Sequence, residues 1–146
     1  MALPDPDRDG QFYQGVPLRR FAAFVIDFVV ILLLTIIGMF IVALATFGLG
    51  MPLAFVLGAV TGFLYRWLLL KQRSATIGMM LTGIEIRNAQ GEKLDQNEAF
   101  VHTLGFTVTF FFTPLMLIGW FLMLSDPYKR ALHDMVLGSA AINRPN

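Results

Sequence analysis

The sequence predicts an all-α membrane protein, a small transmembrane helical bundle with a short cytoplasmic β-hairpin, on three observations. Apolar residues make up 56% of the 146 residues and charged residues only 14%, whereas a soluble domain carries about a quarter charged residues. The apolar residues gather in three runs that approach or exceed the ~20 residues needed to cross a bilayer. One polar stretch separates the second run from the third. Lipid is therefore the expected solvent for much of the surface.

The first residues of the chain are acidic and rich in proline and glycine. Asp5, Asp7 and Asp9 stand where a secretory signal peptide would carry basic residues. Proline and glycine favour turns and extended chain. We therefore predict a flexible N-terminal leader over residues 1–17, followed by a membrane domain over residues 18–142.

Two spans are predicted over residues 21–46 and 51–70, joined by an uncharged turn as an antiparallel helical hairpin. In the second span Ala54, Gly58 and Gly62 recur every four residues on one helix face. Small residues let helix backbones approach closely in lipid, so we predict that this face packs against another helix. The alternative is that glycine is simply common in membrane helices.

The third apolar run, residues 99–124, is broken near its middle at residues 113–114 by a Thr-Pro pair. Because proline interrupts a helix, the run is either one kinked span or two half-helices that form a re-entrant loop. We favour the second, since a single span would place Lys129 and Arg130 outside, against the positive-inside rule. A C-terminal tail, residues 125–146, is expected to contain a short amphipathic helix.

The polar stretch, residues 71–98, is predicted to be a cytoplasmic loop. Weak alternation over residues 81–87, a turn, and a resumption at residues 92–94 favour the β-hairpin, which would lean on the bundle. Asp95 and Glu98 have the spacing of a capping box and predict the start of the next helix.

Basic residues gather at one side of the first two spans, which places the N-terminus and the polar loop in the cytoplasm. These residues are Arg19, Arg20, Lys71 and Arg73.

Asp27 lies deep inside the first apolar run and needs a partner, because an isolated carboxylate is costly in hydrocarbon. Arg20 shares its helix face but lies about 10 Å away along the axis. Arg66, in the second span, lies at a similar depth, and we predict that it pairs with Asp27. The pair would either fix how the hairpin docks or let Asp27 exchange a proton or cation; on the residues alone the first is preferred.

The sequence speaks against catalysis and metal binding. Cysteine is absent, which excludes thiol chemistry, and with two histidines a zinc site is not expected. His133 and Asp134 are adjacent, so their side chains are expected to diverge on a helix, and His102 is expected at the membrane interface. No nucleophile elbow or phosphate-binding loop is present. A net charge of +1 argues against nucleic acid. We predict no enzyme activity, cofactor or metal.

Several of these residues, in this order, resemble the RDD family, small membrane proteins named for one arginine and two aspartates. The resemblance runs along most of the chain through Arg20, Asp27, Thr76, Gly78, the run 83–86, Gly91, the run 130–134 and Gly138. It implies that Arg20, Asp27 and Asp134 are signature residues, with Thr76, Gly78 and His133 as secondary motif positions. Met79 and His102 depart from the pattern, which commonly has a lysine and an arginine there.

The resemblance implies a bacterial cytoplasmic (inner) membrane protein that transports a small ion or solute, coupled to protons or cations. The alternative is a non-enzymatic assembly or adaptor subunit of a membrane complex. So few spans hardly enclose a pathway, so we expect a homo-oligomer or a membrane protein partner within the lipid bilayer. A pairing of Asp134 with Arg20 would keep the tail on the cytoplasmic side.

Overall fold

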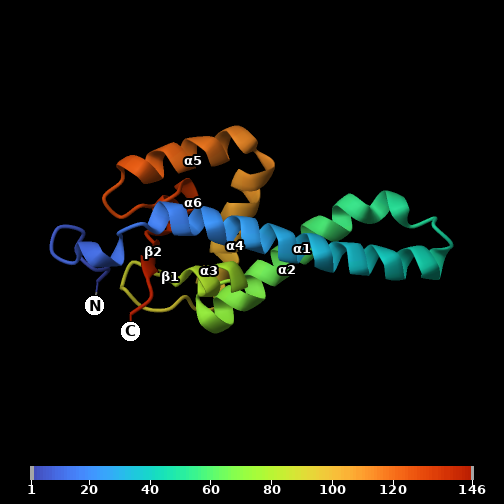
Figure 1. The fold of residues 1–146 in the computed structure, drawn as a ribbon, viewed down its shortest axis with the longest axis horizontal. Helices are drawn as coiled ribbons and strands as arrows, with labels where there is room; N and C mark the ends of the chain where they lie inside the picture. Colours follow the sequence, from blue (N-terminus) through green and yellow to red (C-terminus); the bar gives the residue numbers. More distant parts are fainter. Residues whose placement is uncertain (1, 146) are drawn as a thin grey trace.

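The chain folds as a long antiparallel helical hairpin, with the remaining elements gathered around one end of it (Figure 1). The structure is a computed structural model and describes residues 2–145. The hairpin consists of α1 (Val16–Thr46) and α2 (Ala54–Arg73), with the 3₁₀ helix η2 (Met51–Leu53) in the turn. Both arms, each taken with its neighbouring 3₁₀ turn, are long and apolar enough to cross a membrane, as predicted.

Helix α1 starts five residues before the predicted span. Pro17 lies in its first turn, where the missing N–H of proline is tolerated and its fixed φ suits the helix. The helix ends at Thr46, and Phe47 adopts a left-handed conformation that closes the end. The basic residues before the apolar run therefore belong to the same continuous helix as Asp27.

The third apolar run forms two helices, α4 (Gln96–Phe111) and α5 (Thr113–Ser125), that meet at an angle of 112°. The break falls at Phe112, next to the predicted position, because Pro114 occupies the first turn of α5. This geometry is that of a broken span or a re-entrant loop, and a continuous kinked helix is not formed. The predicted capping box is confirmed, and it starts α4 directly after Asp95.

The predicted β-hairpin is wrong in its second strand. Strand β1 (Ile84–Arg87) pairs antiparallel with β2 (Ala140–Asn143) from the tail, and Lys93 contributes only an isolated bridge to Arg87. The tail segment forms the second strand because its apolar residues are almost wholly buried in the core when it pairs with β1. In residues 92–94 only Leu94 is apolar and buried, so this segment offers less apolar surface for such a strand.

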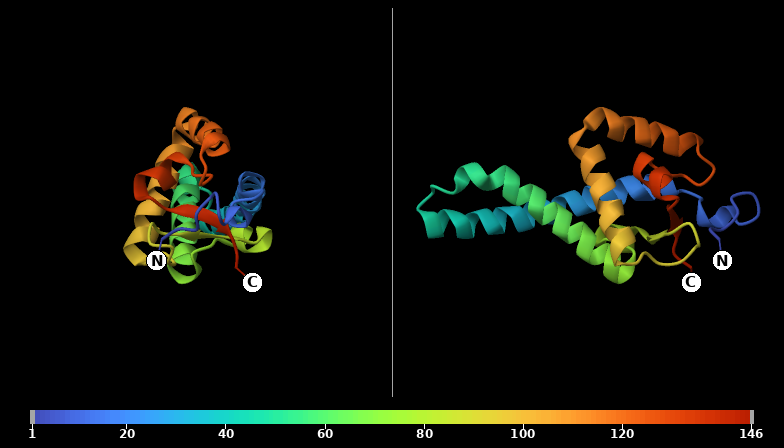
Figure 2. Two further views of the ribbon diagram at one scale, coloured as in Figure 1. Left: turned by 90° about the vertical axis from the view of Figure 1, so that its left-hand side faces the viewer. Right: turned by 180° about the vertical axis from the view of Figure 1, so that it is seen from behind.

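Among the residues that the structure describes, the leader packs against the rest of the protein and is not a free, extended segment. It contains the 3₁₀ helix η1 (Gly10–Phe12), and the buried Tyr13 packs edge-on against Tyr128. Asn143 at the end of β2 donates hydrogen bonds to two backbone carbonyls of the leader. The leader, the polar loop and the tail thus lie together at the end of the molecule opposite the hairpin turn (Figures 1 and 2).

Two further short helices complete this end. α6 (Leu132–Leu137) is the predicted tail helix, and α3 (Ile77–Thr82) lies in the polar loop, where no helix was predicted. α3 packs against α1, whereas α6 packs against α4 and α5. The protein is therefore mostly helical, with two candidate membrane-spanning helices, a bent helix pair and a two-stranded sheet.

Candidate functional site

Asp27 is buried where α1, α2 and α3 meet, and three uncharged donors bind its carboxylate. The Tyr65 hydroxyl donates to Oδ1 at 2.7 Å, and the Gly78 amide donates to the same oxygen at 2.8 Å. The Thr76 hydroxyl donates to Oδ2 at 2.6 Å. Hydrogen bonds to an ionised acceptor are among the stronger ones. The carboxylate therefore has its partners within the fold.

Thr76 and Gly78 explain why α3 lies against α1. Thr76 caps the N-terminus of α3 by accepting from the Met79 amide, while its hydroxyl proton goes to Asp27. A Cβ at Gly78 would lie 2.2 Å from the carbonyl oxygen of Ala23 and 2.8 Å from Asp27 Oδ1. Only glycine permits this approach, so the threonine–glycine motif and the first aspartate form one structural unit.

The predicted ion pair between Asp27 and Arg66 is not formed. Successive residues on a helix point about 100° apart, so Tyr65 faces Asp27 while the neighbouring Arg66 faces α4. A depth counted in residues carries no information on this direction. Tyr65 is thus the residue that sequence reasoning missed.

Arg66 itself has no hydrogen bond or ion pair with any residue in the described part of the chain. Its side chain is 7% exposed, and its Nε is buried without a partner. The guanidinium carbon lies 3.9 Å from the centre of the Phe106 ring on α4, a cation–π contact. The contact with the ring face offsets only part of the hydration free energy that a guanidinium loses when it is buried.

Arg20 and Asp134 form the expected ion pair. The Nη1–Oδ2 distance is 2.5 Å, and Asp134 on α6 is completely buried. The same carboxylate accepts from the Ala131 amide and the Ser139 hydroxyl and lies 2.7 Å from His102 Nε2. Burial alone would raise the pKa of Asp134, but the Arg20 guanidinium and the other partners outweigh it and hold the pKa well below its usual range.

The two histidines lie against each other beside this carboxylate, contrary to expectation. Asp134 turns back to bind the Ala131 amide, which brings its Oδ1 to 3.8 Å from His133 Nε2. His102 is not at an interface but fully buried, because α6 covers it. Gly105 permits this cover, since a Cβ there would lie 2.9 Å from His133 Cβ. Burial lowers the pKa of His133 well below its usual value.

His102, His133 and Asp134 bring one ligand atom each within 4.8 Å of one another, a spacing that a metal ion could use. This cluster could not be found from local sequence patterns, because its two histidines lie far apart in the chain. Arg20 already neutralises the carboxylate, and a divalent cation would stand beside that guanidinium. The expectation that no metal binds here stays a prediction.

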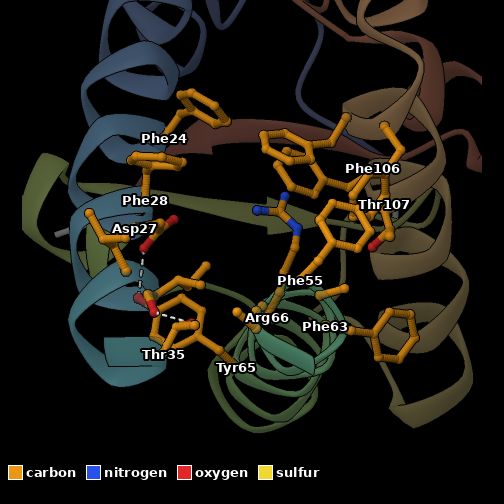
Figure 3. Close-up of a pocket in the computed structure, with 18 residues that line it drawn as sticks. Phe24, Asp27, Phe28, Thr35, Phe55, Phe63, Tyr65, Arg66, Phe106 and Thr107 are labelled. Carbon is orange, nitrogen blue, oxygen red and sulfur yellow. Dashed lines mark hydrogen bonds between the residues drawn. The ribbon is translucent and has the colours of Figure 1, made fainter. Parts of the chain in front are cut away.

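Two cavities meet at Arg66. The first, of about 270 Å³, lies between α1, α2 and α4 (Figure 3), and the second, of about 650 Å³, lies between α1, α5 and α6. Both are lined by Phe24, Asp27, Arg66 and Phe106, and the second also reaches Arg20. The buried charges therefore stand at the junction of two otherwise apolar spaces.

Gly58 and Gly62 of α2 face α1, whereas Ala54 is exposed, and their role differs from the predicted close packing. A Cβ at Gly58 would lie 3.5 Å from the Thr35 side chain, and one at Gly62 would lie 3.6 Å from Ile31. These are ordinary contact distances. Ala54, Gly58 and Gly62 all line the first cavity, so their small size leaves space between the helices.

Comparison with protein-family models identifies one family. A model described as the RDD family matches residues 15–138, most of the chain. No curated protein and no solved structure matches the chain significantly.

Proposed function

Because this chain belongs to the RDD family, we propose that it is a non-enzymatic membrane protein that takes part in transporting a small ion or solute. The binding residue in this proposal is Arg66, which belongs to a buried charged centre formed with Arg20, Asp27 and Asp134.

The observation that carries the proposal is the unpartnered guanidinium of Arg66. Arginine keeps its charge in proteins, and burying an ion without a partner costs several kcal/mol. An ionisable residue inside a membrane segment is a functional-site hypothesis by default. A bound species that offers negative charge or hydrogen-bond acceptors would relieve this cost, and the two adjoining cavities give it room.

The other charges of the centre support a positioning role. Three donors already hydrogen-bond to Asp27, so a proton or cation that bound there would compete with them. Asp134 is likewise held by Arg20 and His102. We therefore place the bound species at Arg66, and we assign to Asp27 the docking of α3 instead of ion exchange.

The proposal includes an orientation and a larger assembly. The leader, the polar loop and the tail share one end of the molecule, and the basic residues near the span ends favour the cytoplasm for that end, in a bacterial cytoplasmic (inner) membrane. Two candidate spans and one bent helix pair hardly enclose a pathway alone. A homo-oligomer or a membrane protein partner would complete it.

A role as an assembly or adaptor subunit is the second candidate. It is favoured because most of the buried charges already have ion-pair or hydrogen-bond partners within the protein. Three of the four charged groups of the centre have partners within the fold, as expected of a purely architectural network. A stoichiometric partner recovered after crosslinking in native membranes would support this candidate. A chain that stays free of partners would count against it.

Purified protein in liposomes tests the transport proposal. A pH-sensitive dye inside the vesicles would report proton flux driven by a gradient of an anionic solute that Arg66 could bind, with gradients of sodium or potassium applied for comparison. We expect flux with the wild type, its loss in Arg66→Gln, and wild-type flux in Arg73→Gln, which alters an exposed arginine on the same helix. Asp27→Asn serves as the comparison. If this variant stays folded and loses as much flux as Arg66→Gln, Asp27 would be the residue that exchanges the ion. No flux with any gradient would remove the proposal.

A further inference from the structure

The Arg66 side chain points from α2 into the space between α1 and α4 (Figure 3). It is more than nine-tenths buried, and its Nε is aimed into protein without a hydrogen-bond partner. No hydrogen bond joins Arg66 to the polar side chains Tyr65 and Thr107 on the cavity wall: the Tyr65 hydroxyl donates to Asp27, and the Thr107 hydroxyl donates to a backbone carbonyl of its own helix. A hydrogen-bond acceptor from a bound molecule would therefore stabilise the Arg66 guanidinium.

Away from Arg66 the same cavity is almost wholly apolar. Its walls run along α1 and α2 toward the hairpin turn and include Ile31, Leu32, Phe55, Gly58 and Gly62, with Thr35 as a polar residue among them. Twelve residues separate Ala54 from Arg66 on α2, which is about 18 Å at 1.5 Å per residue. Half of a ~30 Å hydrocarbon core is about 15 Å. The apolar part of the cavity thus matches the depth of one bilayer leaflet.

Charge and shape together define the ligand. A guanidinium binds carboxylate and phosphate oxygens in a bidentate manner. Arg66 lies nearer to the polar end of α2 than to the hairpin turn, so an anionic head bound there would direct its tail along the apolar walls toward the turn. The volume of about 270 Å³ is at the low end for ligand pockets and suits one hydrocarbon chain better than two.

We propose that this cavity binds a single-chain anionic amphiphile from the bilayer, with its carboxylate or phosphate on Arg66 and its tail along the Gly58–Gly62 face of α2. The inference names the ligand class of the site in the proposed function and rests on Arg66 being its binding charge. A free small anion would leave the apolar walls unfilled. A cation would meet Arg66, and the Asp27 carboxylate already has three donors.

The test uses the full-length protein in phosphatidylcholine nanodiscs and a palmitate analogue that carries a photoreactive diazirine near its tail end. We expect crosslinks on α2 and α1 near Gly58, identified by mass spectrometry, and competition by oleate. Oleyl alcohol shares the tail without the charge, and acetate and inorganic phosphate share the charge without the tail. None of these three should compete at concentrations at which oleate does.

Three variants separate the head from the tail. Arg66→Gln should lower oleate affinity about tenfold or more, the effect of ~1.4 kcal/mol, whereas Arg73→Gln should leave it unchanged. Gly58→Leu should also weaken oleate binding, because its side chain would enter the tail space while its Cβ meets nothing closer than 3.5 Å. Leucine is also the better helix former, so this variant is expected to fold.

Each other outcome overturns the inference. Equal competition by oleyl alcohol would mean that the tail alone binds, and competition by acetate or phosphate would mean a small-anion site. Equal affinity in Arg66→Gln and Arg73→Gln would remove Arg66 as the head-binding group. Phosphatidylglycerol competing better than oleate would point to a two-chain lipid. Oleate binding without flux in liposomes would contradict only the transport proposal, and flux without oleate binding would contradict only this inference.

Discussion

Arg20 near the start of α1 and Asp134 on α6 form a buried ion pair, although 114 positions separate them in the sequence (134 − 20). The pair joins the first helix to the tail and closes the polar end of the molecule. His102 on α4 binds the other oxygen of the same carboxylate. Asp134 therefore connects α1, α4 and α6.

Removal of either partner should destabilise the protein strongly. A buried charge that loses its partner costs about 3–5 kcal/mol. We expect a larger loss in Asp134→Leu than in Arg20→Met, because Asp134 also holds His102 and the Ala131 amide. Denaturant unfolding in detergent micelles would measure both. The double variant should lose less than the sum, and a coupling energy below about 0.5 kcal/mol would show that the two residues act independently.

Gly78→Ala should detach α3 from α1. The added Cβ would lie 2.2 Å from the Ala23 carbonyl oxygen, so the backbone must move and the Asp27 hydrogen bonds would be lost. We expect a loss of about 2–4 kcal/mol, combining overpacking with lost hydrogen bonds. Gly10→Ala is the matched control, since nothing lies within 4 Å of a Cβ there. Equal melting temperatures of the two variants would contradict this reading of Gly78.

Asp27 should be coupled to Thr76 and much less to Arg66. The Thr76 hydroxyl donates directly to the carboxylate at 2.6 Å, and hydrogen bonds to charged groups contribute about 1.5–3 kcal/mol. Double-mutant cycles with Asp27→Ala, combined with Thr76→Val or with Arg66→Gln, would measure the two couplings. A larger coupling with Arg66 would restore the ion pair that the sequence predicted.

Cysteine labelling should place the leader, the polar loop and the tail on one side of the membrane. The chain has no cysteine of its own, so single replacements report cleanly. Arg8→Cys, Gln90→Cys and Arg144→Cys should react with an impermeant maleimide from the same side, and Leu49→Cys in the hairpin turn from the other. All four positions are exposed. A tail that labels with Leu49 would mean that α4 and α5 cross as one broken span.

Acidification should destabilise the protein through His133. The unfolded chain binds a proton at this residue near pH 6.5, whereas burial lowers the folded-state pKa well below that value. The contribution of His133 to stability is therefore complete above about pH 6.5 and is lost as the pH falls below it, by at most ~1.4 kcal/mol per pH unit. Burial also lowers the pKa of His102, which adds a contribution of the same sign. Asp134, whose pKa is held low by Arg20, does not titrate in this range. His133→Phe keeps a ring against Phe106 and should remove the His133 contribution when the free energies of unfolding at pH 7.5 and 5.5 are compared.

Sequence reasoning found the positions along the chain well and the directions of side chains poorly. The two spans, the break before Pro114 and the capping box at Asp95 all follow from local patterns. The depth of Arg66 could be counted in residues, but its direction around the helix depends on where α4 packs. The partner of Asp27 was therefore taken to be Arg66, when the adjacent Tyr65 has the direct contact.

Long-range pairings were the other failure. Two segments were possible partners for strand β1, one nearby and one more than fifty positions away. The distant segment pairs with β1 because its apolar residues become buried there. The histidine cluster likewise forms only because α6 returns to cover α4. The ion pair of Arg20 with Asp134 was foreseen through the family resemblance, since no local pattern links these two residues.

The pairing of β1 with β2 also sets an order of events during synthesis. The membrane helices can insert as they emerge, but β1 has no strand partner until residues 140–143 have been made. Until then its unpaired edge is a template for association with other chains. Interruption of translation shortly before that point should therefore yield inserted but aggregation-prone molecules.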